Sequence, residues 1–240
     1  MEVHHHPHVE KKSFKEYFLE FLMIFLAVTL GFIAENIREH ISEHSSAKIL
    51  AQSMLEDLKK DTSSLNVNIA FSHKKLNSLD TVIAMLHLRR DKWNDTSFYK
   101  NITPVMISYP FASTDGTYSQ MKTSGTLRYF KQSLVNLMNA YAVQLKKTEY
   151  RDEVEDKGTW IVAPYNFDIM NLEVINDIRF NKPIVHEMYL KVSDKTMVDK
   201  YVNLVTMIKS FRTRTLMEYE EQLKIANKLI NALQKEYHLK

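Results

Sequence analysis

The segment Phe18 to Ala34, FLEFLMIFLAVTLGFIA, constrains the fold of this chain more than any other part. A helix needs about 20 mostly apolar residues to cross the roughly 30 Å hydrocarbon layer of a bilayer, and Tyr17 to Ile37 supplies a stretch of that length. The sequence therefore predicts a single transmembrane helix over residues 17–37. A His- and Lys-containing tail over residues 1–16 and a domain over residues 38–240 lie on opposite sides of it.

Glycine and proline are scarce, with only four glycines and five prolines in 240 residues. A many-stranded sheet requires more turn residues than this. We therefore expect an all-α fold, in which the transmembrane helix continues into an elongated antiparallel helical bundle with coiled-coil-like long helices. About 200 residues beyond the anchor are enough for one domain with its own core.

Charge is nearly balanced, with 32 Lys and Arg against 29 Asp and Glu. The two signs are spread over the whole chain and do not gather into a basic face, so we expect no nucleic-acid partner. The chain contains no cysteine, which excludes disulfides, thiolate metal sites and a cysteine nucleophile.

Lysines and arginines on the two flanks predict the orientation of the membrane helix. Lys11, Lys12 and Lys15 precede it, whereas Arg38 and Lys48 follow it. The side richer in these residues tends to stay in the cytoplasm. The expected location is thus the inner membrane of a bacterium with an outer membrane, with the carboxyl-terminal domain in the periplasm.

A cleaved signal peptide is the alternative to an anchor. The strictly apolar stretch Phe21 to Ala34 is short, and Thr29-Leu30-Gly31 resembles a cleavage site. The helical pattern continues beyond Gly31, which favours the anchor.

Three long helices are indicated beyond this point. Apolar residues recur at steps of four and three over residues 37–86, and neither glycine nor proline occurs between Gly31 and Pro104. One helix could therefore reach about Arg90, although small polar residues at 61–64 could also begin a second, stacked helix. The same spacing starts again at Leu127.

The carboxyl-terminal helix is expected to start near Ser193 or Asp194, and its last half has heptad spacing. We expect this stripe and the one at 37–86 to exceed what packing within the chain uses. The residues of this candidate interaction stripe are Leu216, Tyr219, Leu223, Ile230, Leu233 and Tyr237.

Turn residues predict the connections. Residues 91–116 form a long connection that packs over the bundle, and Asp115 caps a short helix that Ser124-Gly125 ends. Gly158 to Pro164 is expected to be a second turn, followed by a short helix that stops before Lys182-Pro183. Seven aromatic residues are expected in the core at the bundle end: Trp93, Tyr99, Tyr109, Phe111, Tyr118, Tyr129 and Trp160.

The opening sequence, MEVHHHPHVEKKSFKEYFLEFLMIFLAVTLGFIAENIREH, followed by SMLEDLKKDT up to Thr62, resembles a family of uncharacterised bacterial proteins. These have one amino-terminal membrane helix and a helical extracytoplasmic domain. The segment TYSQMKTSGTLRYF, Thr117 to Phe130, is similar to a segment of other single-pass proteins of unknown function. The resemblance implies an inner-membrane protein and carries no catalytic residues.

Residues that could carry chemistry are few. His4, His5, His6 and His8 could gather around a divalent metal, but a terminal tail does not fix its ligands, so we expect no metal site. Neither a nucleophile elbow, a phosphate loop nor a zinc-protease motif occurs, and we expect no catalytic residue and no cofactor.

Two carboxylates mark the edges of the membrane helix. Glu20 lies inside the predicted span, where a central carboxylate costs about 3 kcal/mol, and Glu35 lies near the other end. We expect Glu20 to reach the interface or to contact a second copy, with proton coupling as the alternative.

These features favour a non-enzymatic, membrane-anchored interaction or scaffold protein, which contacts the bilayer and either a second copy or an envelope protein. An extracytoplasmic ligand sensor acting through a partner and an ion-coupled oligomer using Glu20 are the alternatives.

Overall fold

The structure is a computed structural model that describes residues 13–192 and 194–240. Within these residues the chain is helical and contains no strand, which confirms the all-α fold. It forms two compact units that meet between Ile49 and Leu50, and each is described separately below.

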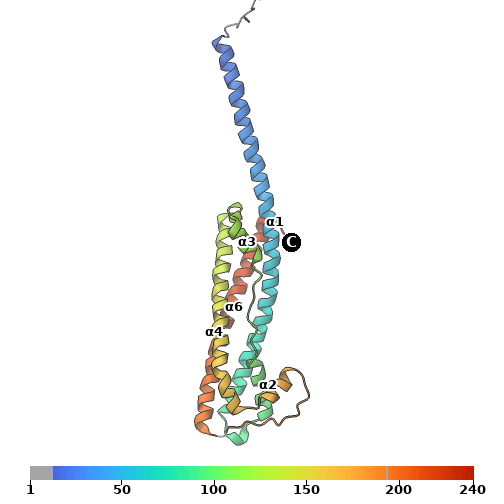
Figure 1. Ribbon diagram of the computed structural model, residues 1–240, viewed down its shortest axis with the longest axis vertical. Coiled ribbons are helices and arrows are strands. Elements are labelled where there is room, and N and C mark those ends of the chain that lie inside the picture. The colour runs from blue at the N-terminus through green and yellow to red at the C-terminus, as the bar shows by residue number, and fades with distance from the viewer. Residues whose placement is uncertain (1–12, 193) are drawn as a thin grey trace, which may run out of the picture. The chain divides into compact units, whose positions relative to one another are not determined.

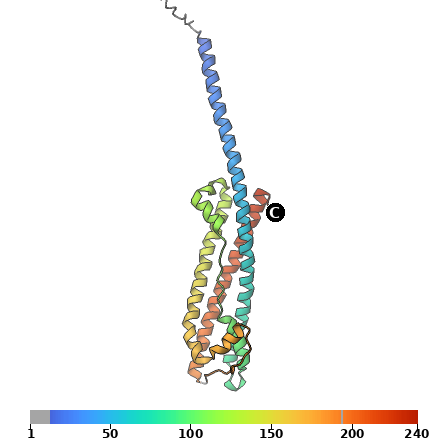
Figure 2. The ribbon, with the colours of Figure 1, turned by 45° about the vertical axis from the view of Figure 1, so that its right-hand side comes forward.

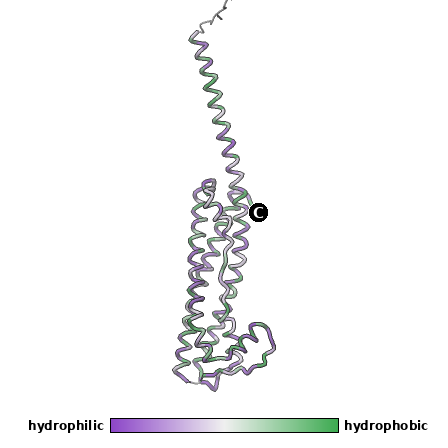
Figure 3. The backbone as a smooth tube through the Cα atoms, viewed as in Figure 1, coloured by the Kyte–Doolittle hydropathy of each residue, from purple (hydrophilic) through white to green (hydrophobic). Residues whose placement is uncertain are grey.

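Helix α1, Phe14–Leu86, begins in the first unit and contains 73 residues. An 18-residue window near its amino terminus has a mean hydropathy of 2.2, and none of that window is buried. Figure 3 shows this apolar band along the first part of the helix. By length and composition this helix could cross a membrane.

The alternative break in α1 at residues 61–64 does not occur, since the helix continues to Leu86. Asp61 does not cap a helix of its own. Its carboxylate accepts hydrogen bonds from Ser113 Oγ at 2.6 Å and from the Thr114 N–H at 2.7 Å. The polar residue that suggested a helix start is used for a tertiary contact.

The second unit, Leu50–Lys240, is a bundle of three long helices (Figures 1 and 2). These are the part of α1 from Leu50 onward, α4 (Gln132–Ile169) and α6 (Lys195–Tyr237). Helices α1 and α4 run in the same direction, and contacts between them join residues eighty positions apart, as in Lys75–Glu155 and Asp61–Tyr141. Helix α6 runs antiparallel to both.

Parallel packing of α1 and α4 requires a connection that returns along the bundle. Residues 106–115 make this return, and we call them the return segment. The predicted 91–116 connection is therefore only partly irregular. It also contains a short 3₁₀ helix, Arg90–Lys92, and helix α2, Asp95–Val105, with Pro104 in the last turn.

The predicted turn at Gly158 to Pro164 is wrong, because α4 continues through both residues to Ile169. A Cβ atom at Gly158 would lie 2.4 Å from a ring carbon of Phe211 on α6. Glycine is thus needed here for close approach of two helices and not for a turn. Pro164 is exposed, so water can bond the carbonyl that loses its helical partner.

The shorter helices lie where the sequence predicts them. Helix α3, Gly116–Ser124, ends at Gly125, whose φ of 73° suits glycine. The predicted cap is wrong, because the Asp115 side chain makes no capping hydrogen bond at the start of α3. Helix α5, Leu172–Arg179, ends before Lys182. Asp194 caps α6 by accepting a hydrogen bond from the Met197 N–H.

The core has two parts within the second unit. The larger lies where the end of α1, α2, the end of α4, α5 and the start of α6 meet, around residues such as Leu79, Tyr99 and Tyr201. The smaller joins Leu65, Leu145 and Tyr219 to Phe111 of the return segment. An aromatic side chain therefore fixes the return segment to all three long helices.

Candidate functional site

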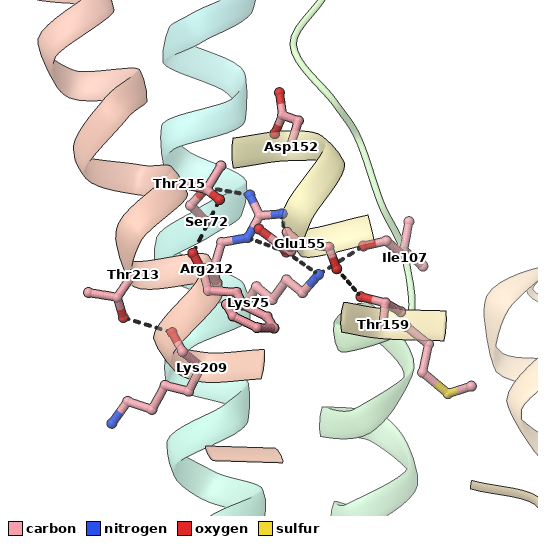
Figure 4. A network of polar contacts seen from close by, with 12 residues as sticks. Ser72, Lys75, Ile107, Asp152, Glu155, Thr159, Lys209, Arg212, Thr213 and Thr215 are labelled. Carbon is pink, nitrogen blue, oxygen red and sulfur yellow. Dashed lines mark hydrogen bonds and ion pairs between the residues drawn. The ribbon is translucent and has the colours of Figure 1, made fainter. Parts of the chain in front are cut away.

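Three charged side chains meet in the interior of the bundle (Figure 4). Lys75 from α1, Glu155 from α4 and Arg212 from α6 are 1%, 3% and 2% exposed. Glu155 Oε1 accepts from Lys75 Nζ at 3.0 Å and from Arg212 Nε at 2.8 Å, and also from Arg212 Nη2. We call these three residues the buried triad.

Each member of the buried triad occupies an inward position of its helix. On α4, Glu155 follows the buried residues Leu145 and Asp152, and on α6 Arg212 follows Ile208. Arg212 Nη1 also donates to Ser72 Oγ at 3.1 Å, so Arg212 joins α6 to both other long helices. The polar interior fixes the relative register of the helices, because a shifted register would leave a buried charge unpaired.

The buried triad is incompletely satisfied. Among the described residues, Glu155 Oε2 is buried without a hydrogen-bond partner. Burial lowers the pKa of Lys75, and the charge of Glu155 opposes that shift. A carboxylate already shared by two cations is a poor general base, so the geometry favours a structural role.

Asp152 lies one helical turn from the buried triad. It accepts from the Phe111 N–H at 3.0 Å and from the Tyr219 hydroxyl. Burial raises the pKa of Asp152 to about 6, and these two hydrogen bonds together with the charge of Arg212 offset only part of that effect.

Acidification should reduce the cost of burying Asp152. Its pKa is about 6 in the folded chain against an ordinary 3.8, so the folded state binds this proton more tightly. The ionised side chain therefore costs up to about 3 kcal/mol above pH 6, and that cost is absent below pH 3.8. We expect the wild type to gain about 1–3 kcal/mol relative to Asp152→Asn between pH 7.5 and 4.5, measured by urea unfolding. An Asp156→Asn control keeps Asp152, so the wild type should show no such gain relative to it. Parallel pH profiles for wild type and Asp152→Asn would contradict the assignment.

The return segment is attached to these buried groups along its length. Lys75 Nζ donates to the Ile107 carbonyl at 3.2 Å, Asp152 holds the Phe111 N–H, and Asp61 holds Ser113 and Thr114. Just beyond it, Asp57 accepts from the Thr117 N–H at 3.3 Å. The buried polar groups therefore supply hydrogen-bond partners to an irregular segment whose backbone has none in a helix or sheet.

A cleft of about 380 Å³ opens beside the return segment, between α1, α3 and α4. Buried Met54, Leu58 and Leu145 line the cleft with apolar side chains, and Tyr118 from α3 also lines it. The Tyr118 hydroxyl donates to Asn139 Oδ1 of α4 at 2.7 Å, which joins α3 to α4 across this cleft.

The outer side of α4 carries an exposed apolar group of residues. Trp160, Ile161 and Phe167 are 71%, 58% and 55% exposed, and Pro164 is exposed between them. Spacings of four and three residues place Trp160, Pro164 and Phe167 on one side of the helix. We call these four residues the α4 face.

The structure corrects the prediction that the apolar stripe of α6 is available for a partner. Leu216, Tyr219, Leu233 and Tyr237 are buried inside the bundle, and Leu223 and Ile230 are partly buried. The stripe of α1 is buried in the same way from Ala51 onward. Packing within the chain uses these stripes, so they are not surplus surface for a partner.

The other predicted positions are dispersed. Glu35 pairs with Arg38, whose Nε lies 2.9 Å from the carboxylate, and Glu20 lies in the apolar part of α1. The four tail histidines lie outside the described residues. Of the seven aromatic residues expected in the core, Tyr99 and Phe111 are buried, whereas Tyr109 and Trp160 are exposed.

Metal ligands are not gathered in the described part of the chain, where no group of three His, Asp or Glu residues could hold an ion. No protein-family model matches this chain, and neither the curated proteins nor the solved structures gave a match. The resemblance of the opening residues to a family of membrane proteins therefore stays a prediction.

Proposed function

We propose that this chain is a non-enzymatic, membrane-anchored assembly protein of the bacterial cell envelope. In this proposal residues 17–37 cross the inner membrane once, the amino-terminal tail lies in the cytoplasm and the bundle lies in the periplasm. The unburied apolar window of α1 and the excess of lysines before it support this arrangement.

The observation that carries the proposal is the α4 face. Contiguous exposed apolar surface on a soluble unit often marks a protein interface, and tryptophan is enriched among the residues that dominate binding energy. Trp160 is 71% exposed although α4 buries its opposite side in the bundle. The α4 face thus offers an aromatic anchor that packing within the chain does not use.

We assign the α4 face to a second copy of this chain. Copies anchored in one bilayer present identical faces and are confined to two dimensions, which raises their effective concentration. A pair related by a twofold axis would bring each α4 face against its equivalent, the usual arrangement in homodimers. The bundle would then act as a scaffold that holds two anchors together.

Removing the two large aromatic side chains should dissociate this pair. Each truncation is expected to cost about 1–3 kcal/mol of binding, so Trp160→Ala with Phe167→Ala should weaken dimerisation about 100-fold. Mass photometry of the full chain in detergent measures this. Val143→Ala with Tyr150→Ala is the matched control, since both residues are exposed on α4 outside the α4 face. A monomeric wild type, or a double variant that dimerises equally well, would sink the proposal.

A further inference from the structure

The cleft between α1, α3 and α4 has the properties of a small-molecule site. Its volume of about 380 Å³ lies in the usual range for such sites, about 300–1,000 Å³. Met54 and Leu58 supply an apolar floor, and Tyr118 adds an aromatic wall. The cleft lies entirely within the second unit and is separate from the α4 face.

Two carboxylates of α1 lie in this cleft without a matching cation. Asp57 and Asp61 are four residues apart, so they share one face of the helix. Asp61 is 2% exposed, and it accepts hydrogen bonds from Ser113, Thr114 and Tyr141, which are neutral donors. Across residues 13–192 and 194–240, the ion pairs join neither carboxylate to a Lys or Arg.

Hydrogen bonds satisfy both carboxylates, but all of the donors are neutral. Like charges at this spacing on a helix repel each other, and an added cation would relieve that repulsion. Lys122 and Lys146 lie on the exposed rim of the cleft, together with the acidic Asp115 and Glu149. The four rim charges therefore sum to zero, and the net negative charge of the cleft is that of Asp57 and Asp61 on α1.

We propose that the cleft binds a small organic ammonium ion. The charged end lies against Asp57, next to the buried Asp61, and the hydrocarbon part lies on Met54 and Leu58. A bare divalent metal fits this site less well, because calcium takes six to eight oxygen ligands and magnesium demands near-ideal octahedral geometry, whereas the floor here is apolar. An organic cation satisfies both the charge and the apolar surface.

Isothermal titration of the full chain in detergent tests this with putrescine and choline as probes. We expect saturable binding of at least one of these amines, and none of 1,4-butanediol, which has the length of putrescine without its charge. Asp57→Asn should weaken amine binding about 10-fold, because the attraction between the carboxylate and the ammonium charge is lost while an acceptor for Thr117 remains. Glu56→Gln, an exposed neighbour on α1, should leave binding unchanged.

Three outcomes would overturn the inference: no saturable binding of either amine, equal weakening by Asp57→Asn and Glu56→Gln, or preferred binding of succinate, which would assign the cleft to Lys122 and Lys146. If Asp57→Asn disturbs the fold, Glu149→Gln on the rim provides the second test and should weaken binding by a smaller factor. The α4-face double variant should bind the amine normally, so this result and the dimerisation result are independent.

Discussion

Replacing Glu155 with leucine should lower the free energy of unfolding by about 3–5 kcal/mol. The substitution leaves Lys75 and Arg212 in the interior without their shared carboxylate, and an unpaired buried charge is strongly destabilising. Urea unfolding of the full chain in detergent, followed by the far-ultraviolet circular dichroism of the bundle, measures the change.

Two variants distinguish the buried triad from a general effect of charge removal. Glu153→Leu removes an exposed carboxylate two residues away on α4 and should change stability by less than about 0.5 kcal/mol. The triple variant Lys75→Met, Glu155→Leu and Arg212→Met removes all three charges and should regain most of the lost stability. If Glu155→Leu alone were as stable as the wild type, the buried triad would not hold the bundle together.

Replacing Asp61 with alanine should release the return segment. The Ser113 hydroxyl, the Thr114 N–H and the Tyr141 hydroxyl would lose their shared acceptor, and we expect a loss of about 3 kcal/mol. Hydrogen exchange should rise first at residues 111–115, because these backbone groups have no helix or sheet to protect them.

The matched control for Asp61→Ala is Glu56→Ala, which removes an exposed carboxylate from the same helix and should leave hydrogen exchange at residues 111–115 unchanged. Asp61→Asn keeps one acceptor oxygen and should fall between the two. An equal rise in hydrogen exchange across the whole bundle of Asp61→Ala would contradict a role of Asp61 in the return segment alone, since it would mean that the whole unit opens together.

The long helices could be predicted from the sequence because their spacing is a local property. Apolar residues at steps of three and four predict α1, α4 and α6, whichever neighbour covers them. The exceptions are Gly158 and Pro164, because glycine and proline usually mark the end of a helix. Gly158 serves a close contact with Phe211, and that ring lies more than fifty residues away in sequence.

The candidate sites depend on relations between helices that the sequence does not state. Glu155 looks like any other acid in a charged stretch until α1 and α6 place Lys75 and Arg212 beside it. The heptad stripe of α6 was assigned to an outside partner because periodicity shows that a face is buried, not what buries it. The spacing of Trp160, Pro164 and Phe167 was visible, but the expected turn at Gly158 to Pro164 obscured it.

The central proposal is that two copies meet through the α4 face, and site-specific cross-linking in native membranes tests it most directly. The chain has no cysteine of its own, so Pro164→Cys introduces a single thiol in the middle of the α4 face. Ser210→Cys is the control, because Ser210 is exposed on α6 and lies outside the α4 face. With a short bifunctional maleimide, we predict a product of twice the 28.2 kDa chain mass for Pro164→Cys and none for Ser210→Cys. The absence of that product, or equal yields from both positions, would contradict the proposal.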